Sequence, residues 1–243
     1  MSAARAGSRR NSEANAGAAG TAGSPKAVGT REATPASSIT ARIVEAVAER
    51  ARGRCPVRVL GLTGPPGTGK TTIAAELAAE LPRAGVAVAG MVPMDGFHMS
   101  NAVLAARGIA DHKGAPDTFD VGGYMALLGR VRRADSVVLA PDYRRDLHEP
   151  VAASLPVEVE GVVITEGNYL GLELPGWADV RGLIDLLVYI DTPFEELASR
   201  LIDRHVSYGR DRADAGHWVR TVDAANMALV ERTKERADLM LSL

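Results

Sequence analysis

The residues with the clearest chemistry in this sequence form the run GPPGTGKT, from Gly64 to Thr71. The run matches the pattern G-x-x-x-x-G-K-[ST] at every defined position, after a strand-like apolar stretch and before an Ala-rich one. Its glycines Gly64, Gly67 and Gly69 allow the backbone to curl, so that successive N–H groups point at one anion. The amino end of the following helix adds positive charge. This spacing predicts a loop that binds the phosphates of a nucleoside triphosphate.

Two side chains of this loop carry further chemistry. We expect Lys70 to bridge the β- and γ-phosphates, and the Thr71 hydroxyl to ligate Mg²⁺. The predicted nucleotide-binding residues are contiguous: Gly64, Pro65, Pro66, Gly67, Thr68, Gly69, Lys70, Thr71 and Thr72.

Two carboxylates follow predicted strands. Asp95 comes after the strand at 86–92, and Glu166 ends the apolar run 162–165, a candidate Walker B strand. Residues just past the carboxyl ends of parallel strands line the ligand crevice of an open α/β sheet. Asp95 could accept a proton from an attacking hydroxyl or hold the metal, or it could merely form a turn with Gly96. Glu166 is expected to orient a Mg²⁺-bound water or to contact the acceptor hydroxyl.

The elements that must position these residues alternate along the chain. Strands are predicted at 57–63, 86–92, 136–140, 162–165, 183–190 and 238–241. Helices are predicted from about 38, after the phosphate loop, at 121–133 with Asp120 as its cap, and up to about 205. The last of these begins at an apparent capping box, Thr192 to Glu195, with Pro193 at the first helical position. The alternation predicts an α/β P-loop fold of three layers, with a mostly parallel sheet flanked by helices.

The chain divides into a tail over residues 1–37 and a predicted P-loop domain over 38–243. Apart from alanine, the only hydrophobic residues up to Ala36 are Met1 and Val28, so the tail cannot bury enough surface to offset its ordering entropy. We expect disorder. The alternative, a transit peptide, is disfavoured by Glu13 and Glu32.

Several motifs together resemble one family. GLTGPPGTGKTT, MVPMDGFHMSNAVLAARG, HKGAPDTFD, APDYRRDLHEP and ITEGNYL occur in that order and are similar to the phosphoribulokinase/uridine kinase family, from Leu60 to the end of the chain. Within it, the chain resembles bacterial type I pantothenate kinases and related nucleoside and sugar kinase-like proteins. The resemblance implies an ATP-dependent phosphotransferase that phosphorylates a hydroxyl of a small molecule.

The resemblance also implies roles for individual residues. It makes Asp95 the catalytic base. The resemblance also assigns five residues to the acceptor pocket: His98, Lys113, Tyr143, His148 and Tyr169. In the pantothenate branch Leu-Tyr follows the Asp-Gly-Phe motif, whereas His98 and Met99 stand there in this chain. The acceptor therefore stays open among a nucleoside, pantothenate and a sugar.

Arg200 and Arg204 lie four residues apart, with Leu197 and Leu201 expected to face the core. Resemblance to related kinases suggests a lid, continued over 205–214, whose arginines neutralise the transferring phosphate. We therefore name both arginines as candidate catalytic residues beside Lys70 and Asp95. The alternative is a solvated charged helix face.

Composition limits the remaining function classes. The net charge is −2, so no basic patch indicates nucleic acid, and no apolar run reaches membrane-spanning length. The single cysteine, Cys55, excludes an internal disulfide, and the 5 histidines lack metal-ligand spacing. Trp177 and Trp218 are expected to pack. We expect a cytoplasmic protein whose partner is a small-molecule hydroxyl acceptor; relatives are often homodimers.

A second function class stays open: a nucleotide-dependent switch that hydrolyses ATP or GTP slowly without an acceptor. The chain contains neither the Asn-Lys-x-Asp motif that reads guanine nor the Leu-Ser-Gly-Gly-Gln signature of transporters. A switch would also leave the Asp-Gly-Phe-His motif without a purpose. The sequence therefore favours the kinase.

Overall fold

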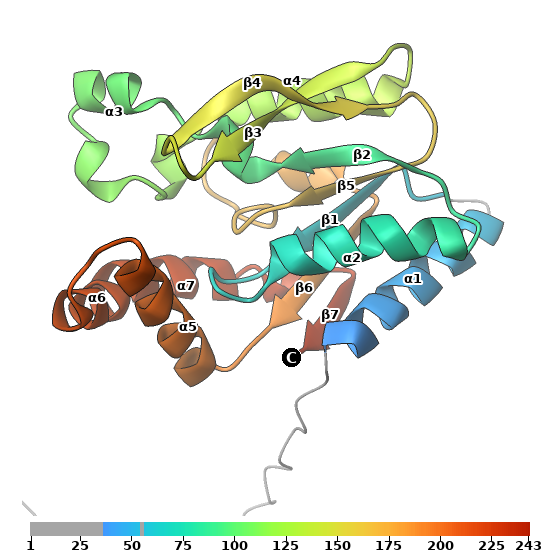
Figure 1. Cartoon of the computed structure of the whole chain (residues 1–243). Helices are drawn as coiled ribbons and strands as arrows, with labels where there is room; N and C mark the ends of the chain where they lie inside the picture. Colours follow the sequence, from blue (N-terminus) through green and yellow to red (C-terminus); the bar gives the residue numbers. More distant parts are fainter. Residues whose placement is uncertain (1–35, 54–55) are drawn as a thin grey trace, which may run out of the picture. The chain divides into compact units, whose positions relative to one another are not determined.

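The computed structural model describes residues 36–53 and 56–243. Its centre is a sheet of parallel strands in the order β2-β5-β1-β6-β7 (Figure 1). These strands are β1 (Val59–Thr63), β2 (Val88–Pro93), β5 (Val162–Glu166), β6 (Leu186–Asp191) and β7 (Leu239–Ser242). Because β1 lies between β5 and β6, the loop after β1 sits near the middle of the sheet's carboxyl edge.

Helices cover both faces of this sheet. Side chains alternate along the strands: in β6, Leu187 joins one hydrophobic cluster, whereas Leu186 and Val188 join the other. The helices α1 (Ala36–Arg52) and α2 (Lys70–Arg83) pack on one face, and α4 (Val121–Arg133) packs on the other. The predicted three-layer α/β fold is therefore confirmed.

Most predicted elements occur within a few residues of their expected bounds. Asp120 caps helix α4, as predicted: its side chain accepts a hydrogen bond from the Gly123 N–H at 2.9 Å. The remaining helices are α3 (Asn101–Arg107), α5 (Phe194–Ser207), α6 (Arg212–Trp218) and α7 (Ala224–Glu231), with the short turns η1 (Met94–Phe97), η2 (Ala110–His112), η3 (Pro116–Thr118), η4 (Val180–Leu183), η5 (Val219–Asp223) and η6 (Lys234–Arg236).

The strand predicted at 136–140 pairs with a different strand from the one that the alternation of strands and helices suggested. Strand β3 (Val138–Arg144) does not join the parallel sheet and instead pairs antiparallel with β4 (Glu149–Val157). The sequence did not predict β4, because this strand contains Pro150 and Pro156 and is largely exposed, and so lacks an alternating apolar face. Helices α3, α6 and α7 were also missed. The hairpin packs beside β2, where a Cβ on Gly90 would approach the Pro156 carbonyl.

The predicted capping box before α5 is wrong. Pro193 is the N-cap residue rather than the first helical residue, and no side-chain hydrogen bond caps this helix. The Thr192 hydroxyl is buried and has no hydrogen-bond partner in the described part of the chain. The Pro193 carbonyl accepts the first bonds, from the N–H groups of Glu196 and Leu197.

The tail predicted over residues 1–37 lies outside the described residues, except that α1 begins at Ala36. Cys55 also lies outside them. Among the helices of residues 36–53 and 56–243, none is long and apolar enough to cross a membrane.

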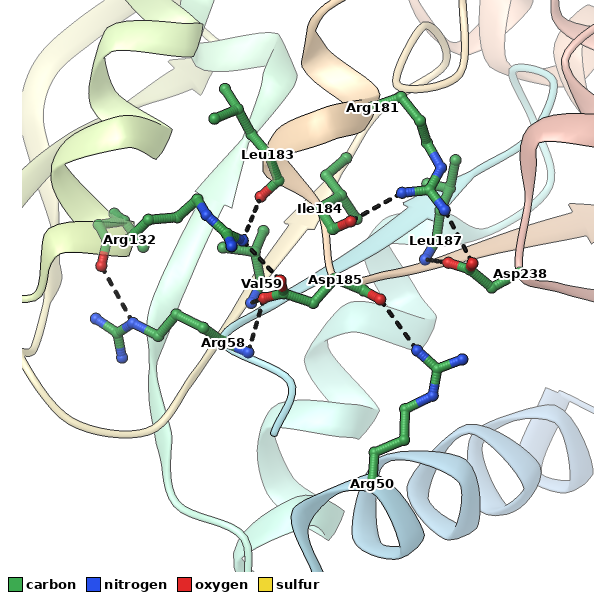
Figure 2. Close-up of polar contacts among 11 residues, drawn as sticks. Arg50, Arg58, Val59, Arg132, Arg181, Leu183, Ile184, Asp185, Leu187 and Asp238 are labelled. Atoms are coloured by element: carbon green, nitrogen blue, oxygen red, sulfur yellow. Dashed lines mark hydrogen bonds and ion pairs between the residues drawn. The ribbon is translucent and has the colours of Figure 1, made fainter. Parts of the chain in front are cut away.

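Charged side chains join the amino ends of the strands, at the edge opposite the phosphate loop (Figure 2). The Asp185 carboxylate, just before β6, accepts hydrogen bonds from the backbone N–H groups of Arg58 and Val59, both at 2.9 Å. It also pairs with Arg132 of α4 at 2.7 Å. Its backbone carbonyl accepts a bond from Arg50 of α1 at 3.0 Å. Asp185 therefore links both helical layers to β1 and β6.

We expect Asp185→Ala to lower the free energy of unfolding by about 2–3 kcal/mol, because two strand N–H groups and the Arg132 guanidinium lose their acceptor. Urea unfolding followed by circular dichroism measures this change. Asp135→Ala is the matched control, since its ion pair with Arg133 is long, at 3.6 Å, and exposed; about 0–1 kcal/mol is expected there. Equal losses at both positions would contradict a structural role for the Asp185 cluster.

Candidate active site

The phosphate loop connects β1 to α2, and its backbone requires glycine. Gly64, Gly67 and Gly69 have φ values of 147°, 88° and 81°, in the region that residues with a Cβ rarely adopt. A Cβ on Gly64 would also lie 2.5 Å from the Ile190 carbonyl oxygen of β6. Gly69 is the N-cap of α2, so the positive end of this helix faces the loop.

Lys70 is buried inside this loop. Its Nζ donates hydrogen bonds to the carbonyl oxygens of Gly64 and Pro65, both at 2.8 Å, and to the Thr68 hydroxyl at 3.3 Å. Burial lowers the pKa of Lys70 to about 8, although the negative charges of Glu166 and Asp95 act in the opposite direction. The ammonium therefore has neutral hydrogen-bond partners, and an anionic phosphate would stabilise its charge.

The side chains of Thr71 and Glu166 contact each other next to the phosphate loop. The Thr71 hydroxyl donates a hydrogen bond to Glu166 Oε1 at 3.0 Å. Burial raises the pKa of Glu166, and the nearby Asp95 carboxylate raises it further, whereas Lys70 lowers it. Hydroxyl and carboxylate oxygens are the ligands that Mg²⁺ prefers, and Mg²⁺ takes only one or two of them from the protein beside phosphates and water. The pair fits that ion.

Asp95 lies on the turn η1, directly after β2. It lines a cavity of about 750 Å³ together with Lys70, Thr71 and Glu166. Gly96 beside it is fixed by packing, since a Cβ there would lie 2.4 Å from the Pro141 carbonyl oxygen of β3. The turn that the sequence suggested does exist, and it holds the Asp95 carboxylate in the cavity.

The five residues predicted for the acceptor pocket separate into two groups. His98, Lys113 and Tyr169 line the cavity, whereas Tyr143 and His148 do not. Tyr143 lies behind the first two, with its ring centroid 4.9 Å from that of His98 and 5.2 Å from Lys113 Nζ. The His148 side chain is exposed, with its ring edge-on to that of Tyr208 at 6.3 Å between centroids, and its backbone carbonyl accepts a bond from Lys113 at 2.7 Å.

Two further hydrogen bonds hold His98 and Tyr169 in place. His98 Nδ1 donates to the Asp95 carbonyl at 2.8 Å, and burial lowers the pKa of His98. The Tyr169 hydroxyl donates to the Gly114 carbonyl at 2.7 Å. His98 is therefore held beside Asp95 in a form that favours the neutral ring.

Helix α5 brings the two predicted arginines to the cavity. Leu197 and Leu201 are buried, as expected, and pack against Gly67 of the phosphate loop. Arg200 donates to the Gly67 carbonyl at 3.3 Å and pairs with Glu196 at 3.0 Å. Arg200 and Arg204 both line the cavity, so they do not form a purely solvated face.

The cavity is also lined by His205 and Arg210 of the predicted lid segment 205–214, and by residues that the sequence did not assign to the site. His205 Nε2 donates to Asp223 Oδ2 at 2.9 Å, which joins α5 to the π-turn η5. Arg210 lies 4.1 Å from the ring centroid of Trp218, which lines the cavity wall. Arg145, in the hairpin turn after β3, is at the rim. No local pattern predicted a site role for Asp223 or Arg145, because each reaches the cavity through contacts between elements distant in sequence.

Comparison with known proteins identifies the fold and its chemistry. The family model described as an AAA domain matches residues 60–228. Escherichia coli YggC is 34% identical over 76% of this chain and 77% of its own length. The Schizosaccharomyces pombe protein named "Putative uridine kinase C227.14" is 32% identical over 75% of this chain and 82% of its own.

A crystal structure from Silicibacter sp. TM1040, described as a "putative fructose transport system kinase", has a TM-score of 0.76 and 34% identity, and covers 83% of this chain and 98% of its own. Further relatives are named "Pantothenate kinase" (Shouchella clausii, 29% identical over 64% of this chain and 51% of its own) and "Uridine kinase" (Borrelia turicatae, 27% identical over 76% of this chain and 86% of its own). The chain therefore matches the AAA-domain family model and belongs to the phosphoribulokinase/uridine kinase family of P-loop kinases, as an ATP-binding phosphotransferase with an alcohol group as acceptor.

Proposed function

We propose that this protein transfers the γ-phosphoryl group of ATP, with Mg²⁺, to a hydroxyl of a nucleoside, pantothenate or a sugar. The observation that carries the proposal is that Asp95 lines the same cavity as Lys70 and Glu166. A nucleotide-dependent switch would need the phosphate loop but not a carboxylate at the end of β2. The kinase reaction uses both.

Each residue of the cavity has a task in this proposal. The Asp95 carboxylate orients the acceptor hydroxyl and takes its proton as the bond to phosphorus forms. Lys70 stabilises the negative charge of the phosphates, and the loop's N–H groups hold them in place. Thr71 and Glu166 would hold Mg²⁺, which neutralises phosphate charge when bound.

A panel of acceptors tests the proposal. ADP production is measured with ATP and Mg²⁺, without acceptor and with uridine, cytidine, pantothenate, fructose and other sugars in turn. Strong dependence of ADP production on one acceptor supports the kinase. A slow rate that no acceptor increases would contradict it and would favour the switch.

The arginines of α5 give a second test. If Arg204 or Arg200 meets charge that develops only in the transition state, its change to Ala should lower kcat about 10- to 100-fold while the ATP affinity stays nearly unchanged. Steady-state kinetics and isothermal titration with ATP measure the two effects. Arg83→Ala is the control, since Arg83 pairs with Glu80 on the surface, away from the cavity.

An equal loss of ATP affinity would mean that these arginines contact the bound nucleotide in the ground state. No loss at either position would assign both arginines to the helix surface.

A further inference from the structure

Positive side chains dominate the wall of the cavity. Six cationic residues line it, against three carboxylates. The cations are Lys70, Lys113, Arg145, Arg200, Arg204 and Arg210, and the carboxylates are Asp95, Glu166 and Asp223. The triphosphate of ATP accounts for the cations of the phosphate loop and of α5, and Arg210 packs over the Trp218 ring. Lys113 and Arg145 come from other elements and call for a separate explanation.

Arg145 differs from its neighbours in its partners. Arg144, one residue before it, pairs with Asp146 at 2.7 Å, and Arg132 and Arg212 pair with carboxylates in the same way. Arg145 forms no ion pair with any described residue; its hydrogen bond is to the neutral Tyr208 hydroxyl, which raises the pKa of Arg145. A guanidinium at the rim of a cavity with a neutral partner is available to an anion.

The Lys113 ammonium is likewise available to an anion. Its Nζ donates to the Asn101 amide oxygen and to the His148 carbonyl, both at 2.7 Å, and these acceptors are neutral. The ammonium also lies over the Tyr143 ring, and the charge of Arg145 acts on the Tyr143 hydroxyl from the hairpin turn. Lys113 and Arg145 therefore both lie near Tyr143, and among the described residues neither has a carboxylate within hydrogen-bond distance.

This group lies next to Asp95, the residue that orients the acceptor hydroxyl in the proposed function. Tyr143 stacks beside His98, whose Nδ1 is bonded to the Asp95 carbonyl. Arg145 is also close enough to Asp95 and Glu166 for their charges to act on it. The charge of Glu149 acts in the same way on Lys113, but no carboxylate of the described residues is in hydrogen-bond contact with either cation. A neutral acceptor would displace water from both cations without supplying negative charge of its own, which costs free energy. An anionic acceptor would avoid that cost.

We propose that Arg145, assisted by Lys113, binds an anionic group of the phosphate acceptor, so that the acceptor is a hydroxy acid or a phosphorylated sugar rather than a neutral nucleoside. This inference rests on the proposed kinase function and narrows its acceptor class. Carboxylate and phosphate both match the fork of donors on a guanidinium.

Paired acceptors that differ in charge test the inference. ADP production is measured with pantothenate and its neutral alcohol panthenol, with D-glycerate and glycerol, and with fructose 6-phosphate and fructose; uridine is added as a neutral nucleoside. We expect the charged member of at least one pair to have a kcat/KM at least tenfold above that of its neutral partner. The glycerate and pantothenate pairs report a carboxylate, and the fructose pair reports a phosphate.

Substitutions then assign the effect to Arg145. With the preferred acceptor, Arg145→Gln should raise the acceptor KM about 10- to 100-fold and leave the KM for ATP unchanged, whereas Arg145→Lys should lose less because it keeps the charge. Arg144→Gln is the matched control from the same hairpin and should change neither constant. Thermal unfolding with and without ATP checks that each variant is folded.

Two results would overturn the inference while leaving the kinase intact: a neutral acceptor preferred over every charged one, or an Arg145→Gln enzyme that loses kcat with an unchanged acceptor KM. The second result would place Arg145 on the transferring phosphate. If no acceptor increases ADP production although ATP binds, the proposed function fails, and this inference fails with it.

Discussion

Lys70→Ala is expected to lower the rate of phosphoryl transfer by roughly 10³-fold or more, because this reaction depends mainly on positioning and on charge stabilisation. Lys70 Nζ already lies in the loop, within 2.8 Å of the Gly64 and Pro65 carbonyl oxygens. The variant loses the one ammonium of the loop, and its partners in the absence of nucleotide are backbone carbonyls rather than a carboxylate. The fold should therefore persist.

Acceptor-dependent ADP production measures the effect, and thermal unfolding checks the fold. Arg83→Ala is a matched control, because it removes a cation from the other end of the same helix, where Arg83 pairs with Glu80. That variant should keep its full rate. A Lys70→Ala enzyme that keeps more than about a tenth of the wild-type rate would remove Lys70 from the mechanism.

The sequence predicted the parts of this structure that local patterns determine. The phosphate loop, the parallel strands and α4 with its Asp120 cap depend on residue spacing within one segment. The predicted positions of Asp95 and Glu166 followed from one topological rule, that parallel strands bring their carboxyl ends to one edge. Those predictions needed no knowledge of how the elements pack.

The parts that the sequence did not predict depend on contacts between distant segments. Strand β4 has no apolar alternation of its own and is defined by its pairing with β3. The bond between His205 and Asp223 joins residues 18 positions apart through a π-turn. Arg145 and Arg144 are identical in type and adjacent in sequence, but Arg144 pairs with Asp146 whereas Arg145 lines the cavity. His148, predicted as a pocket side chain, contributes its carbonyl instead.

Asp95→Asn is expected to bind ATP and Mg²⁺ almost normally and to lose at least a hundredfold in acceptor-dependent phosphorylation, since the loss of a general base typically costs about 10²–10⁴-fold. The substitution keeps the shape of the side chain and removes its charge. In a loose transition state the proton leaves late, so the carboxylate also serves to orient the hydroxyl. An amide can do this only in part, because its NH₂ group does not accept a hydrogen bond.

Single-turnover transfer to the acceptor and ATP titration separate the outcomes for Asp95, with Asp111→Asn as a control carboxylate that is exposed and outside the cavity lining. A variant that loses affinity for ATP and Mg²⁺ would make Asp95 a metal-shell residue beside Glu166. A variant that keeps full activity would leave Asp95 with the role of fixing the η1 turn. The base would then be sought at Glu166, the other carboxylate near Lys70; burial raises the pKa of Glu166, which favours proton acceptance.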